Sequence, residues 1–282
     1  MPHVVIPEAE AILDKEFPVL DKGFVRLVDY MGSDQRIVAA ARVSYGQGTK
    51  TVREDQGLIN YLMRHEHTSP FEQVVLTFHC KMPIFVARQW IRHRTARLNE
   101  ISGRYSVMKD EFYTPALEAL RTQSTANKQG RSEDALPPAQ AEEARSSLQA
   151  GQREAYARYE AMLQHDLARE IARIALPLSL YTEWYWQIDL HNLFHFLRLR
   201  LDEHAQWEIR EYAKVMAAIT RAVAPMSWSA FESYRLRAAS VSGESLAWLR
   251  DRLPAELAMP KDLKEALEKA PPAAPTLPEE PN

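Results

Sequence analysis

The sequence has little of what would mark an exported or membrane protein. Its single cysteine, Cys80, excludes an internal disulfide and fits a reducing compartment. Residues 1–15 include charged side chains at positions 8, 10, 14 and 15, so they lack the apolar run of a signal peptide. The apolar runs fall far short of the roughly 20 residues that cross a bilayer. We therefore expect a cytoplasmic protein that does not span a membrane.

Glycine is also scarce, with nine residues in 282. Neither G-x-G-x-x-G nor G-x-x-x-x-G-K-[ST] occurs, which disfavours a dinucleotide-fold dehydrogenase and a P-loop enzyme. Any bound phosphate must then be held by side chains. The net charge of −3 offers no global attraction to nucleic acid, so we expect no nucleic-acid partner.

Positive charge is instead concentrated between Arg88 and Tyr105. This stretch has five arginines and His93 against one acid, Glu100, so its local charge is +4 with the histidine neutral. The arginines are Arg88, Arg92, Arg94, Arg97 and Arg104. The planar guanidinium suits bidentate contacts to phosphate. Cations that only complement a helix dipole would explain about two of the five. The stretch therefore predicts a site for a phosphate-bearing nucleotide.

Apolar periodicity predicts an α+β protein that is mainly helical. Alternation predicts a strand at 73–81, and we expect extended segments at 104–107 and 181–190. Helices are expected at 30–45, 51–65, 84–94, 154–176, 191–204 and 207–223. Residues 1–253 are expected to form a single domain, in which 122–151 is a polar surface insertion. Residues 254–282 are rich in Pro, Ala and Glu and are expected to form a mobile tail.

One motif is specific enough to suggest a family. Arg92-His93-Arg94 is followed by seven residues and then Ser102, within "RQWIRHRTARLNEISGRYS". This segment closely resembles the flavin-dependent thymidylate synthases. Further similarity lies in "DKGFVRLVDYMGSD", "AARVSYG", "HTSPFEQVVLTFHCKMPIFVARQW", "AREIARIALPLSLYTEWYW" and "LHNLFHFLRLRLDEHAQWEIREYA". The resemblance covers most of Asp21 to Tyr234.

The resemblance implies a mainly helical α+β fold with a small antiparallel sheet. It also implies a homotetramer that holds FAD at subunit junctions. Such an enzyme transfers a methylene group from methylenetetrahydrofolate to dUMP, while NADPH supplies reducing equivalents through the flavin. The product is dTMP, and no cysteine nucleophile takes part.

The matching positions imply two overlapping sets of contacts. Flavin contacts are expected from Ser44, His67, Ser69, Arg92, His93, Arg94, Glu100, Asp189, His191 and His195. Contacts to dUMP are expected from Gln89, Arg92, Glu100, Ser102, Gly103, Arg104, Arg173 and Arg200. Family members can carry Asn in place of Asp189. Arg200 is expected to activate the pyrimidine, because a permanent cation at the uracil edge stabilises negative charge developing on N3 and O4. Ser102 is expected to orient the substrate.

The residues alone leave several alternatives open. Arg200 falls within an apolar helical stripe, so a salt bridge to an acid such as Glu203 is as compatible with the sequence as a ligand contact. His191 and His195 have zinc-ligand spacing but lack a recognised third ligand, so a solvated face explains them better. Cys80 lies on the apolar face of a strand, which favours an inert buried thiol.

Two other functions remain open at this point. A metal-dependent hydrolase would use His191, His195 and a further ligand. A nucleotide- or RNA-binding module without catalysis would use the same arginines. Metal content and salt dependence of binding distinguish these alternatives from a flavoenzyme.

Overall fold

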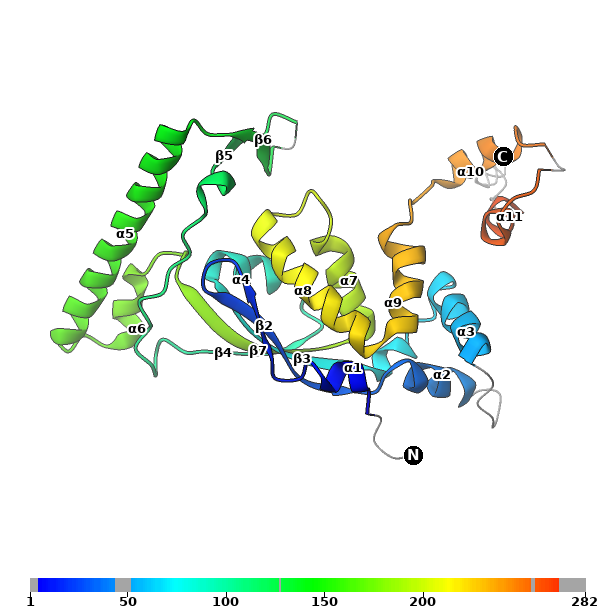
Figure 1. The fold of residues 1–282 in the computed structure, drawn as a ribbon, viewed down its shortest axis with the longest axis horizontal. Helices are drawn as coiled ribbons and strands as arrows, with labels where there is room; N and C mark the ends of the chain where they lie inside the picture. Colours follow the sequence, from blue (N-terminus) through cyan, green and yellow to red (C-terminus); the bar gives the residue numbers. More distant parts are fainter. Residues whose placement is uncertain (1–4, 44–51, 127, 255–256, 269–282) are drawn as a thin grey trace, which may run out of the picture. The chain divides into compact units, whose positions relative to one another are not determined.

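The computed structural model describes residues 5–43, 52–126, 128–254 and 257–268 (Figure 1). Its contacts divide the chain into two units, residues 1–236 and residues 237–282. The second unit contains the short helices α10 (Gly243–Arg250) and α11 (Lys261–Glu268). The boundary expected at residue 253 and the mobility of the tail stay predictions. No helix within the described ranges is both long and apolar enough to cross a membrane.

A five-stranded antiparallel sheet organises the first unit, as expected. Its strand order is β1 (Glu16–Val19), β2 (Gly23–Met31), β3 (Val75–Pro83), β7 (Tyr181–Asp189) and β4 (Arg97–Glu100). The strands predicted near 73–81 and 181–190 are β3 and β7, which pair along their whole length with Phe78 opposite Trp186. Alternate residues of β3, including Phe78 and Cys80, are fully buried. The predicted period-2 pattern therefore marks the face of the sheet that carries the core.

Helices α4 (Ile84–Trp90), α7 (Leu190–Arg200) and α8 (Trp207–Val223) contact the sheet and enclose this core. The bounds predicted for α8 are confirmed, whereas α4 and α7 end about one turn earlier than expected. Trp90, at the end of α4, packs edge-on against Trp184 and Trp186 of β7. The buried ring fixes the point from which the basic stretch leaves the core.

Other helices of this unit are α1 (Pro7–Glu10), α2 (Asp34–Arg42), α3 (Val52–Arg64), η2 (Phe71–Gln73), α9 (Pro225–Phe231) and the π-helical turn η5 (Glu232–Leu236). Asp34 at the start of α2 is buried, and its carboxylate accepts hydrogen bonds from the start of α9. The donors are Met226 N at 2.7 Å, Ser227 N at 2.9 Å and Ser227 Oγ at 2.6 Å. A side chain distant in sequence therefore satisfies the free N–H groups of α9.

The segment predicted as a polar insertion is mostly exposed but has regular structure. After η3 (Leu117–Ala119), it comprises the hairpin β5 (Arg121–Gln123) and β6 (Arg131–Ala135), followed by the 27-residue helix α5 (Pro138–Gln164). The single helix expected over 154–176 is therefore wrong. Asp166 adopts φ 58° and ends α5, and the chain continues as α6 (Arg169–Ala172) and η4 (Arg173–Ala175). Tyr159 of α5 anchors a small second core.

The strand expected at 104–107 is also wrong. These residues form a turn in which the N–H groups of Tyr105 and Ser106 donate to the carbonyl of Ser102. The strand lies upstream as β4, where Leu98 pairs with Trp186 of β7. Because β4 is short and mostly exposed, it lacks the apolar alternation by which strands are recognised in sequence.

Candidate active site

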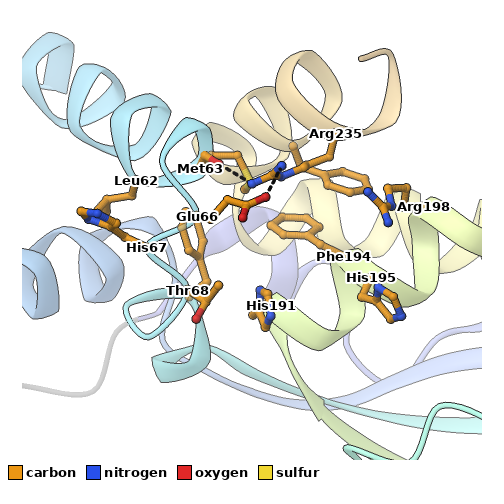
Figure 2. Close-up of a pocket in the computed structure, with 12 residues that line it drawn as sticks. Leu62, Met63, Glu66, His67, Thr68, His191, Phe194, His195, Arg198 and Arg235 are labelled. Carbon is orange, nitrogen blue, oxygen red and sulfur yellow. Dashed lines mark hydrogen bonds and ion pairs between the residues drawn. The ribbon is translucent and has the colours of Figure 1, made fainter. Parts of the chain in front are cut away.

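A cavity of about 320 Å³ lies between the end of α3, α7 and the η5 turn. Figure 2 shows His191, Phe194 and His195 projecting from α7 on one side, with Arg235 across from them. The full lining is Leu62, Met63, Glu66, His67, Thr68, Phe71, His191, Phe194, His195, Arg198, Phe231 and Arg235. Three of the predicted flavin contacts, His67, His191 and His195, are thus brought to one place.

Two interactions hold Arg235, which lines this cavity, in place. Its Nη1 lies 2.9 Å from Glu66 Oε1, and its Nη2 donates to the carbonyl oxygen of Met63 at 2.8 Å (Figure 2). Aromatic rings form the apolar side, since Phe194 stacks on Phe231 with centroids 4.3 Å apart. Such a mixture of apolar wall and a few polar groups is typical of a cofactor site.

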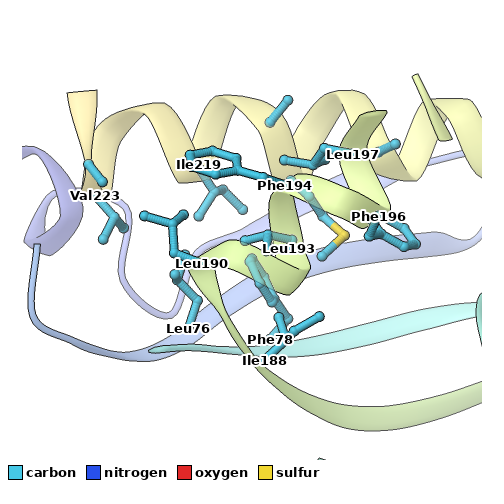
Figure 3. Packing of buried hydrophobic residues seen from close by; sticks show 14 of the residues in the cluster. Leu76, Phe78, Ile188, Leu190, Leu193, Phe194, Phe196, Leu197, Ile219 and Val223 are labelled. Carbon is cyan, nitrogen blue, oxygen red and sulfur yellow. The ribbon is translucent and has the colours of Figure 1, made fainter. Parts of the chain in front are cut away.

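The sequence of α7 gives the helix two different sides, one apolar and one that carries the histidines. Leu190, Leu193 and Leu197 pack on the sheet and α8 (Figure 3). His191 and His195 lie one turn apart and therefore share the side that faces the cavity. Asp189 is the N-cap of the helix, since its carboxylate accepts hydrogen bonds from N and Nδ2 of Asn192 at 2.9 and 2.7 Å. A flavin contact of Asp189 stays a prediction.

A second group forms around Arg200 at the end of α7. Its Nε donates to His93 Nε2 at 3.1 Å, and its Nη2 donates to the backbone carbonyl of Gln89 at 3.3 Å. Arg200 therefore contacts a histidine and a backbone carbonyl, and not the acidic side chain that the sequence offered as an alternative partner. The structure therefore joins three predicted site residues, Gln89, His93 and Arg200, through direct hydrogen bonds.

His93 is a neutral acceptor in this group. Burial, together with the positive charge of Arg200 and the nearby His195, lowers the pKa of His93 to about 4. Because Arg200 only donates, Nε2 of His93 must carry the lone pair and Nδ1 the proton. Its ring also lies 5.9 Å from that of His195, so the Arg200 group adjoins the histidine-lined cavity. Burial and the nearby cations lower the pKa of His195 as well.

A third group gathers at the turn after β4. Gly103 is buried, and a Cβ there would lie 3.1 Å from both Arg173 Cδ and Met108 Sδ. Arg104 pairs with Glu170 at 3.1 Å, and the hydroxyl of Ser102 accepts from the N–H of Arg104 at 3.2 Å. Ser102, Gly103, Arg104 and Arg173 are thus close together, as the predicted dUMP contacts require.

The other predicted residues are distributed around these groups. Glu100 Oε1 accepts a hydrogen bond from Thr182 Oγ1 at 2.6 Å. Arg92, Arg94 and Ser69 are exposed. Ser44 lies outside the described residues. Among the described residues, no hydrogen bond or ring contact joins the Ser102 group to the Arg200 group.

Comparison with known proteins decides the family. A family model described as "Thymidylate synthase complementing protein" matches residues 26–226, which is more than half of the chain. A flavin-dependent thymidylate synthase of Treponema denticola is 64% identical over 239 residues, covering 85% of this chain and 90% of that protein. The chain belongs to the flavin-dependent thymidylate synthase family. The resemblance predicted from the Arg92 to Ser102 motif is thereby confirmed.

Further comparisons support the assignment to the flavin-dependent thymidylate synthase family. An enzyme of Thermus thermophilus is 59% identical over 261 residues, covering 89% of this chain and 94% of that protein. Among solved structures, the UMP/dUMP methylase PolB from Streptomyces cacaoi, bound with 5-Br dUMP, superposes with a TM-score of 0.71. It is 32% identical, over 78% of this chain and 99% of that chain. The mainly helical α+β fold is therefore shared by a methylase that was solved with a bound nucleotide analogue.

Sequence reasoning missed several residues of the site. Arg198 and Arg235 line the cavity, and Gln206 contacts the side chain of Gln89. Arg198 could have been found, because it follows His191 and His195 at helical spacing. Arg235 and Gln206 carry no such signal, since their positions depend on how distant segments pack.

Proposed function

We propose that this chain catalyses the reductive methylation of dUMP to dTMP. Methylenetetrahydrofolate would donate the one-carbon unit, and NADPH would supply the electrons through bound FAD. Family membership and the nucleotide-bound relative support the reaction. The observation that carries the proposal is the hydrogen-bonded group of Gln89, His93 and Arg200, which adjoins the histidine-lined cavity.

The residues present fit a flavin dinucleotide. Arg92 and Arg94 are exposed guanidinium groups without a hydrogen bond or ion pair in the described part of the chain, as pyrophosphate binding requires. His67, His191, His195 and Arg198 supply polar contacts around an apolar wall. When bound, FAD supplies hydride transfer. A zinc hydrolase has less support, because no three His, Cys, Asp or Glu side chains of the described residues gather around a possible metal position.

Arg200 has the geometry to act on the pyrimidine. Two of its nitrogens are held by His93 and by the carbonyl of Gln89, and its Nη1 has no partner among the described residues. A fixed guanidinium of this kind stabilises negative charge on a pyrimidine oxygen without reorganising. Ser102, Gly103, Arg104 and Arg173 would hold the nucleotide, and Gly103 leaves room for the close approach of the Arg173 side chain to the turn.

The chain has no thiol able to attack the pyrimidine. Cys80, its single cysteine, is fully buried in β3, and burial raises the pKa of its thiol well above the usual value. A thiolate nucleophile must be both ionised and accessible. Reduction of the transferred carbon by a hydride fits this chain better than a mechanism with a cysteine adduct.

We further propose a cytoplasmic homotetramer with active sites at subunit junctions. The separation of the Ser102 group from the Arg200 group within one protomer supports a site that several subunits complete. Analytical ultracentrifugation of the FAD-loaded protein tests this, and a monomer that forms dTMP at full rate would contradict it.

The proposed reaction is tested directly with purified protein. We expect a yellow protein that forms dTMP from dUMP only when methylenetetrahydrofolate and NADPH are both present. Omitting each component in turn provides the controls. A protein that stays colourless after FAD reconstitution, and neither oxidises NADPH nor forms dTMP, would refute the proposal.

A further inference from the structure

A buried carboxylate is connected to the Arg200 group through the side chain of Gln206, and the proposed reaction does not explain it. Glu208, in the first turn of α8, is only 4% exposed. It accepts hydrogen bonds from Arg131 Nη2 at 2.5 and 2.6 Å, from Gln206 Nε2 at 2.9 Å and from Tyr113 Oη at 3.2 Å. Arg131 comes from β6 of the inserted hairpin, and its guanidinium lies 5.8 Å from the ring centre of Trp207.

These contacts determine how the side-chain amide of Gln206, and through it that of Gln89, is oriented. A carboxylate paired with a guanidinium accepts hydrogen bonds and does not donate them. The NH₂ group of Gln206 must therefore face Glu208, which turns the amide oxygen of Gln206 toward Gln89. That oxygen accepts a hydrogen bond from Gln89 Nε2. The reversed orientation of either amide would place two acceptors or two donors against each other.

The orientation of Gln206 determines that of Gln89, a residue of the proposed dUMP site. With its NH₂ group turned toward Gln206, Gln89 keeps its side-chain oxygen free of partners among the described residues. The backbone carbonyl of Gln89 is held at the same time by Arg200. Gln89 therefore offers a fixed acceptor beside the guanidinium that is proposed to act on the pyrimidine.

We propose that Glu208 is a positioning residue that acts through Gln206 to hold the Gln89 side-chain oxygen as an acceptor for a donor group of dUMP. The inference rests on the proposed function, and it assigns the inserted hairpin a role, because Arg131 pairs with Glu208. Uracil N3–H and the sugar 3′-hydroxyl are the donors that dUMP offers. The alternative is a purely structural Glu208 that attaches the hairpin to α8.

A double-mutant cycle between Gln206 and Gln89 separates these roles. We would measure dUMP affinity by calorimetry on FAD-loaded protein for Gln206→Ala, Gln89→Ala and the double variant. Gln206 is exposed, so its truncation should leave the fold and the flavin content unchanged. We expect Gln206→Ala to weaken dUMP binding about 3- to 10-fold, the effect of one net hydrogen bond. In the Gln89→Ala background it should cause no further loss.

Two results would overturn the proposal that Glu208 acts on Gln89 through Gln206. One is an unchanged affinity in Gln206→Ala, and the other is a full additional loss in the double variant. A wild-type protein that binds no dUMP would instead refute the proposed function, so the two failures are distinguishable.

Glu208→Gln tests whether the carboxylate of Glu208 sets the orientation of the Gln206 amide. This substitution keeps the shape but can present a donor to Gln206, so we expect weaker dUMP binding that is again not additive with Gln89→Ala. Glu211→Gln is the matched control on the same helix, where Glu211 pairs with Lys214 at 2.7 Å, and it should leave affinity unchanged. If Glu208→Gln does not fold, the Gln206→Ala cycle still decides the proposal.

The donor is identified with two analogues, dUMP methylated at N3 and dUMP lacking the 3′-hydroxyl. The energetic coupling between Gln206 and Gln89 should vanish for one of them and persist for the other. Coupling that persists for both would show that the Gln89 oxygen accepts from neither donor, and would overturn the assigned direction.

Discussion

Replacing Arg200 by Lys tests the proposed active site most directly. Arg200 is half-buried, and it uses two different nitrogens to reach His93 at 3.1 Å and the carbonyl of Gln89 at 3.3 Å. The planar guanidinium spans both partners and leaves Nη1 without a partner among the described residues. A lysine ammonium has all its donors on one nitrogen, so it cannot occupy these positions together.

The size of the effect follows from the two hydrogen bonds that a lysine cannot form. Each of them involves a charged donor and contributes about 1.5 kcal/mol net. If both act on the transition state, their removal costs about 3 kcal/mol, which lowers the rate of dTMP formation by roughly 100-fold. Because the charge is kept, the fold and flavin binding should change little.

The assay is dTMP formation at saturating dUMP, with flavin absorbance and thermal melting as checks on cofactor binding and folding. Arg221→Lys is the matched control, because Arg221 is exposed near the end of α8 and is remote from the proposed machinery. Near-normal dTMP formation by Arg200→Lys would refute the role of the guanidinium. An equal loss in Arg221→Lys would show that the assay reports stability instead.

Three further predictions concern single side chains. The pKa of about 4 for His93 lies below the usual 6.5, so the stability that neutral His93 contributes should be lost as pH falls from 6.5 to 4. The melting temperature of His93→Gln should therefore change less over that window, and an identical profile would contradict the assignment. Asp34→Ala leaves the buried N–H groups of Met226 and Ser227 without their acceptor, and should lower the unfolding free energy by about 2–4 kcal/mol in denaturant titrations. An unchanged midpoint would exclude this capping role. Cys80→Ala should retain dTMP formation while losing about 1 kcal/mol of stability, and an inactive but folded variant would restore the cysteine mechanism.

The sequence predicts the core elements well where apolar periodicity is strong. Residues 207–223 combine a wide apolar stripe with Pro225 just beyond the end, and the predicted bounds of α8 are confirmed. The alternation in β3 predicted the buried position of Cys80. Both features are local, so neighbouring residues suffice to show them.

Prediction fails where distant contacts override local composition. The polar residues 138–151 begin α5, because Pro138 suits the first turn and Tyr159 buries the far half of the helix in the second core. Composition alone suggested a polar surface insertion for this stretch. Strand β4 is likewise defined by pairing with β7 and not by its own residues.

Prediction of the candidate site from sequence is limited in the same way, because distant contacts determine its hydrogen bonds. The motif around Arg92 to Ser102 indicated which residues belong to the site, but not their partners. Arg200 contacts His93 and a backbone carbonyl instead of an acid. Glu208 has no signal in the sequence, because its partner Arg131 is 77 residues away on a hairpin within the segment that was predicted to be a polar surface insertion. Spacing identifies side chains on one helix, whereas hydrogen-bond networks depend on tertiary packing.

The pairing of β3 with β7 has a consequence for the order of folding. Thr77 and Gln187 are 110 residues apart but lie on adjacent strands. During synthesis, the edge of β3 therefore remains unpaired until most of the first unit has left the ribosome. Closing so long a loop is slow, and an unpaired apolar strand can pair with other nascent chains. We expect the yield of folded protein to rise when a chaperone covers this edge during synthesis.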